Sequence, residues 1–169
     1  AVATGGRQVR TDPKAGNIYD HFAITYEYPG GAKGFHISRQ QPGCENSYSV
    51  EAWGTKGNAV IDCSRNIHRI NSNGKVWNYS GEGNDMYQTE HDELFAAIRK
   101  GKVISQGDAV AHGSMLAILG RMAAYTGKKI TWEDAMNSQD ALGPDPASYH
   151  FDLVTPVTAV ATPGVTSFK

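Results

Sequence analysis

The stretch YDHFAITYEYPGGAKGFHISRQQ, residues 19–41, decides the fold of this chain. Its first half alternates between two kinds of side chain, which is the period of a half-buried strand. One side carries Phe22, Ile24, Tyr26 and Tyr28, and the other carries His21, Ala23, Thr25 and Glu27. The Pro-Gly-Gly turn then predicts a hairpin with Gly30-Gly31 at a two-residue tip. The returning segment places Phe35 and Ile37 on one face, so residues 19–41 predict an antiparallel strand pair.

More strands follow before the period changes. The segments SYSVEAW, NAVIDC, NIHRI and KVWNY, between residues 47 and 79, are rich in β-branched and aromatic residues and are separated by turns. Residues 85–101 then repeat apolar side chains at helical spacing, with Asp85 as a candidate N-cap and Gly101 just past the end. A second helix is expected from Asp108 to about Tyr125, and a short third one after Thr131. A last strand is expected near Val157.

Strands first and helices after predict an α+β fold, an open, mostly antiparallel sheet with helices packed on one face. The glycine-rich opening, residues 1–18, is predicted to be a linker or an extended lead-in, and residues 19–169 a single domain. The chain begins at Ala1 rather than Met, so we expect a processed end or a cut within a longer protein.

The glycine-bracketed lysine in GTKG, residues 54–57, raises the question of a phosphate-binding loop. Such a loop needs a longer glycine spacing, a Ser or Thr after the lysine, and a helix that follows at once. Here Gly57 is followed by Asn58, Ala59 and another strand-like run. The motif PGGAKG also lies between two strands. Both motifs therefore predict sheet turns, and no cofactor-binding residue is expected in this chain.

The composition is that of an ordinary globular protein. Net charge is −1, from 16 basic and 17 acidic residues, and no polybasic run occurs. Neither nucleic acid nor a membrane is therefore expected as a partner. The six histidines show no close ligand spacing with an acid, so no metal site is expected. The two cysteines have no metal spacing and do not fix the compartment.

The end of the first hairpin holds the best candidate site. Pairing through a Gly30-Gly31 tip brings His21 opposite Gln40, within one residue, and gathers Arg39 and Gln41 beside Asp20. An imidazole among charged and amide side chains suits a polyhydroxylated ligand. The same residues would also fit an ordinary polar strand end.

Several segments together resemble a known family. They are GNIYDHFAITYEYPGG, FHISRQQ, WGTKGNAVID, YQTEHDELFAAIRKGK and GRMAAYTGKKITWEDAM. In their order and spacing they resemble the C-terminal domain of bacterial Gfo/Idh/MocA oxidoreductases, in the glucose-fructose oxidoreductase-like branch. The resemblance runs from about Arg7 onward. The family's Glu-Lys-Pro motif and its Asp-x-x-x-His pair are not found here, so no catalytic residue is assigned.

The resemblance implies a sugar- or polyol-binding and dimerisation domain. In the family, NAD or NADP is held by a separate N-terminal Rossmann domain, which is missing from this chain. Substrate contacts are then expected from His21, Arg39 and Gln40, with Tyr87 and His91 reaching in from the first helix. Such a chain alone is expected to be inactive. An NAD-dependent glycoside hydrolase and a stand-alone binding or assembly module remain as alternatives.

The resemblance also implies a homo-oligomer joined through the sheet. Ala23 and Thr25, like His36 and Ser38, are expected to make the face without helices only mildly polar. A soluble protein of the bacterial cytoplasm, or one exported to the periplasm, is expected. The sequence does not name the sugar.

Overall fold

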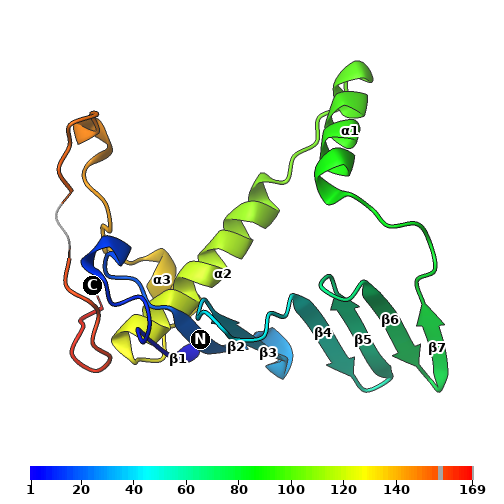
Figure 1. Cartoon of the computed structure of the whole chain (residues 1–169), viewed down its shortest axis with the longest axis horizontal. Helices are drawn as coiled ribbons and strands as arrows, with labels where there is room; N and C mark the ends of the chain where they lie inside the picture. The colour runs from blue at the N-terminus through cyan, green and yellow to red at the C-terminus, as the bar shows by residue number, and fades with distance from the viewer. Residues whose placement is uncertain (156–157, 169) are drawn as a thin grey trace. The chain divides into compact units, whose positions relative to one another are not determined.

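The computed structural model describes residues 1–155 and 158–168, and within them the chain is α+β with two antiparallel sheets and three α-helices (Figure 1). The strand expected near Val157 lies outside the described residues. The chain divides into a first unit, residues 1–42 and 106–169, and a second unit, residues 43–105. No helix in the described part of the chain is both long and apolar enough to cross a bilayer.

The finding of two sheets corrects the prediction of one open sheet. Strand pairing stops at Arg39 and resumes at Ser49. The segment between them contains Pro42, which has no N–H to donate, and Gly43, whose φ of 79° is left-handed. This segment crosses the boundary between the two units, and each unit has a sheet of its own.

The first unit is built on a three-stranded sheet in the order β1-β2-β3. Its strands are β1 (Val2–Gly6), β2 (His21–Glu27) and β3 (Lys33–Arg39). The prediction of a linker over residues 1–18 is therefore wrong for Val2–Gly6. This segment is a strand because it pairs with β2 over its whole length and places Ala3 against the core.

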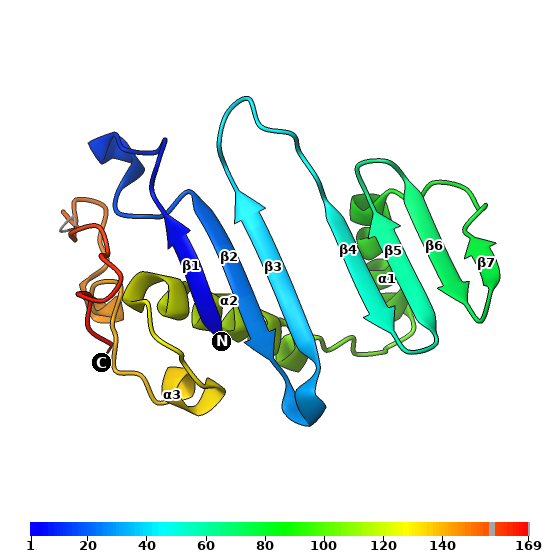
Figure 2. The ribbon, with the colours of Figure 1, turned by 90° about the horizontal axis from the view of Figure 1, so that it is seen from below.

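Helix α2 (Gly107–Thr126) covers one face of this sheet, packing on β1 and β2 (Figure 2). The core between them is made of Ile24, Tyr26, Leu119, Ala123, Ile130 and Ala135. Gly120 brings the helix close, because a β-carbon there would lie 2.5 Å from Ile24 Cδ1 and 2.5 Å from the Tyr26 hydroxyl. The helix ends at Gly127, whose φ of 69° is left-handed. The short helix α3 (Trp132–Met136) begins with the predicted capping box of Thr131 and Asp134.

The β2–β3 hairpin differs from the prediction by one residue of register. The loop is Pro29–Gly31 rather than Gly30-Gly31, since Tyr28 N–H bonds to Ala32 O across it. His21 consequently pairs with Arg39, and Thr25 with Phe35. A register shift of one residue moves every side chain of the strand to the other face of the sheet.

In this register, β3 places His36 and Ser38 on the face covered by α2, where they pair with Ile24 and Phe22 of β2. Phe35 and Ile37 lie on the open face and are 75% and 82% exposed. The expectation that His36 and Ser38 share the open face with Ala23 and Thr25 is therefore wrong. The open face is more apolar than expected.

The second unit holds a four-stranded meander in the order β4-β5-β6-β7. Its strands are β4 (Ser49–Gly54), β5 (Gly57–Asp62), β6 (Ile67–Ser72) and β7 (Lys75–Asn78). GTKG is the β4–β5 turn, as predicted. Helix α1 (Met86–Arg99) follows, with the predicted N-cap Asp85 accepting hydrogen bonds from the next backbone amides.

Candidate functional site

The candidate site is built around Asp20, a charged side chain that is almost completely buried. The residue is 3% exposed. Its Oδ2 accepts hydrogen bonds from the consecutive backbone amides of Gln8, Val9 and Arg10, at 2.7, 2.7 and 3.0 Å. Its Oδ1 lies 2.8 Å from Nδ1 of His21. Each carboxylate oxygen thus has a partner, as a buried charge requires.

These partners control the protonation of Asp20. Burial by itself would raise the pKa of Asp20, but hydrogen bonds from the amides of residues 8–10 and from the His21 ring hold it far below its usual range. Asp20 is therefore a carboxylate throughout the physiological pH range.

His21 begins β2 and lies on the open face, in register with Gly6 of β1 and Arg39 of β3. Its side chain is 37% exposed, so solvent reaches the ring. The predicted proximity of His21 to Arg39 is confirmed. The position is neither under the helix nor packed among apolar side chains.

The loop between β1 and β2 is held in place by Arg7. Its guanidinium donates to the backbone oxygens of Gly16 at 2.6 Å and Asp12 at 2.9 Å, and also to that of Arg10. Asp12 in turn caps the single 3-10 turn Pro13–Ala15. This bracing curls the chain so that three successive amides point at Asp20.

Glutamines belong to the segments next to the Asp20–His21 dyad. Gln41 Nε2 donates to Gln8 Oε1 at 2.9 Å, which joins the end of β3 to the loop after β1. Gln40 follows Arg39, and its backbone N–H bonds to Asp20 O at 2.8 Å. Gln40 is thus beside the site, but the strand partner of His21 is Arg39.

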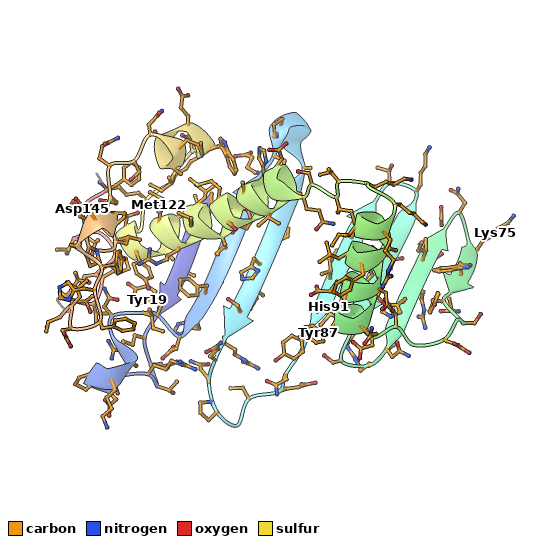
Figure 3. All side chains as sticks on the ribbon, turned by 90° about the horizontal axis from the view of Figure 1, so that it is seen from above. Tyr19, Lys75, Tyr87, His91, Met122 and Asp145 are labelled. Atoms are coloured by element: carbon orange, nitrogen blue, oxygen red, sulfur yellow. The ribbon has the colours of Figure 1, made fainter. Side chains whose placement is uncertain are left out.

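Tyr87 and His91 belong to α1 in the second unit, where Figure 3 shows their side chains. Tyr87 is 67% exposed, and His91 Nδ1 lies 2.7 Å from the Tyr87 backbone oxygen, one turn earlier. Because they lie in a different unit from His21, their contact with the same ligand stays a prediction.

A groove of about 410 Å³ lies on the other face of the first unit's sheet. Phe22, Ile24 and Tyr26 form its apolar floor, and Arg121 of α2 contributes the charged group. Phe22 follows His21 directly and points to the opposite side of the strand. The groove is therefore separate from the Asp20–His21 dyad.

The glycine-rich turns do not fit a dinucleotide. Pro29–Gly31 joins β2 to β3, and residues 54–57 join β4 to β5, so each turn is followed by an antiparallel strand. A dinucleotide loop instead leads into a helix whose N-terminus faces the phosphates. Neither turn can therefore hold the phosphates of NAD or NADP in that way.

Metal ligands do not converge either. Among residues 1–155 and 158–168, no three His, Cys, Asp or Glu side chains are grouped as a metal site would need.

No family model matches the sequence, and no curated protein matches it. The family resemblance therefore stays a prediction, and the site itself has to carry the functional argument.

Proposed function

We propose that this chain is the substrate-binding and dimerisation domain of an NAD(P)-dependent oxidoreductase that acts on a sugar or polyol. The observation that carries the proposal is the solvent-reached His21 ring, oriented by Asp20 and placed in register with Arg39. An imidazole, a guanidinium and neighbouring amide side chains supply both acceptors and donors. A polyhydroxylated ligand needs both at once.

In this proposal the dinucleotide is held by a separate Rossmann domain of the full-length protein. His21 and Arg39 bind and orient hydroxyl groups, with Gln40 at the edge of the site. Holding a substrate in one orientation is a substantial part of catalysis. The chain by itself is proposed to be inactive.

The test is a titration of the chain with D-glucose, D-mannitol and myo-inositol, followed by amide NMR shifts. We expect shifts that gather at the ends of β1, β2 and β3 next to His21. Arg39→Ala should weaken this binding by about 1–3 kcal/mol, since a hydrogen-bonding group is lost. Lys75→Ala, which removes an exposed cation from β7 in the second unit, is the matched control (Figure 3).

In the full-length protein, His21→Ala should lower sugar turnover and leave cofactor affinity nearly unchanged. Turnover without added cofactor, with release of a free sugar, would instead select the glycoside hydrolase. Failure of all three sugars to shift any residue near His21 would favour a binding or assembly module.

We also propose a homodimer through the part of the open face formed around Phe35 and Ile37, with the His21 end of β2 outside the contact. Phe35 and Ile37 are exposed there, paired with Thr25 and Ala23. An isologous contact between two copies of this face would cover them, and a stable one buries about 1,200 Å² or more in total.

A further inference from the structure

The two oxygens of Asp20 serve different partners. Oδ2 is saturated by the three amides of residues 8–10, and Oδ1 is directed at His21 Nδ1. The amides belong to a loop braced by Arg7, so the carboxylate cannot rotate without losing all three. Its orientation is therefore fixed by backbone rather than by flexible side chains.

This fixed carboxylate determines where the imidazole proton lies. An ionised carboxylate only accepts hydrogen bonds, so in the neutral ring Nδ1 must carry the proton that lies between the two groups. The second ring nitrogen, Nε2, then has no proton and can only accept. Arg39, the strand partner of His21, only donates, so of these two side chains only the His21 ring can accept a hydrogen bond from a ligand hydroxyl.

The His21 ring lies against the backbone of β1 at Gly6, where there is no side chain. A β-carbon at Gly6 would lie 3.1 Å from Cε1 and 3.2 Å from Nε2 of His21. A side chain at this strand position would therefore press against the ring near Nε2. With glycine there, the His21 side chain is 37% exposed and solvent reaches the ring.

We propose that Asp20 is a positioning residue that holds His21 as a hydrogen-bond acceptor at Nε2, and that this nitrogen, on a ring that solvent reaches, takes a hydroxyl donor of the ligand. The ligand class rests on the proposed function, whereas the tautomer rests on the dyad alone.

The test is the tautomer of His21, read from its ring nitrogen shifts by NMR on the whole chain in alkaline buffer. The wild type should show the pattern with the proton on Nδ1. In Asp20→Asn the three amides need an acceptor, so the side-chain oxygen stays with them and the NH₂ group turns to His21. That NH₂ donates to Nδ1 and moves the ring proton to Nε2.

An inverted shift pattern in folded Asp20→Asn supports the proposal. A wild-type proton on Nε2, or an unchanged pattern in the folded variant, overturns it. If Asp20→Asn does not fold, the wild-type pattern decides by itself.

The ligand is tested by adding D-glucose and myo-inositol to the wild type, to Gly6→Val and to the control Thr4→Val, which lies on the same face of β1. Sugar should shift the Nε2 resonance in the wild type and in Thr4→Val. In Gly6→Val, the apparent sugar affinity read from that shift should be at least tenfold lower. A proton on Nδ1 with no response to either sugar refutes the hydroxyl ligand and counts against the proposed function, while the role of Asp20 survives.

Discussion

Gly120→Ala and Gly113→Ala change the same helix in the same way and should have opposite effects on stability. At Gly120 the new β-carbon would lie 2.5 Å from Ile24 Cδ1 and from the Tyr26 hydroxyl. Ordinary contacts between non-bonded heavy atoms are about 3.5–4.0 Å, so both groups must move by about 1 Å. At Gly113 no atom lies within 4 Å of the new carbon.

The two costs can be compared term by term. Alanine gains about 1 kcal/mol over glycine inside a helix. Overpacking costs about 1–3 kcal/mol, and displacing the Tyr26 hydroxyl also weakens its 3.0 Å hydrogen bond to Leu116 O, worth about 1 kcal/mol. Gly120→Ala should therefore lower the free energy of unfolding by about 1–2 kcal/mol. Gly113→Ala should raise it by about 0.5–1 kcal/mol.

The assay is urea unfolding and thermal unfolding of the wild type and both variants, each followed by far-UV circular dichroism. A difference of about 2 kcal/mol between the variants corresponds to roughly 4–8 °C in Tm for a domain of this size. If Gly120→Ala is as stable as Gly113→Ala, the close approach of α2 to β2 is wrong.

Four other predictions concern binding, assembly, pH and capping. Isolated chain titrated with NADH should show no micromolar binding by fluorescence or calorimetry, because its glycine-rich turns join strands. Light scattering should give a dimer that Ile37→Arg converts to a monomer, whereas a wild-type monomer at high concentration refutes the sheet-face contact. Because the folded-state pKa of Asp20 is lowered, its contribution to the free energy of unfolding is complete above about pH 4 and is lost as pH falls. The difference in free energy of unfolding between the wild type and Asp20→Asn should therefore narrow in acid. A difference that stays constant with pH would contradict this. Thr131→Ala should cost about 1 kcal/mol in a thermal melt, since it breaks the capping box of α3.

The fold was largely predictable because local patterns determine it. Alternating side chains located the strands, and Asp85 and Thr131 marked helix starts that the structure confirms. The register of β3 was not predictable to one residue. Pro29 joins the two glycines in the loop, and Gly30 and Gly31 have φ of 83° and 84°. Loops of two or three residues are both compatible with that sequence, yet the two loop lengths place the side chains of β3 on opposite faces of the sheet.

The site was predictable in part for a similar reason. The hairpin alone brings His21 to Arg39, so the pairing could be inferred from the chain. The burial of Asp20 depends instead on how residues 7–10 curl, and that curl is fixed by side-chain bonds from Arg7 to backbone oxygens later in the same loop, which no periodic pattern in the sequence reveals. An acid directly before a strand-initial histidine, after a glycine-rich loop, was the available signal.

The first unit is discontinuous, since residues 43–105 separate its strands from α2. During synthesis, Ile24 and Tyr26 leave the ribosome about 100 residues before the helix that buries them is complete. At about 5–20 residues per second, the β1–β3 segment waits roughly 5–20 s with its apolar side uncovered. The second unit is by then fully synthesised. Nascent chains stalled before residue 107 should therefore depend on chaperones far more than chains released after residue 127.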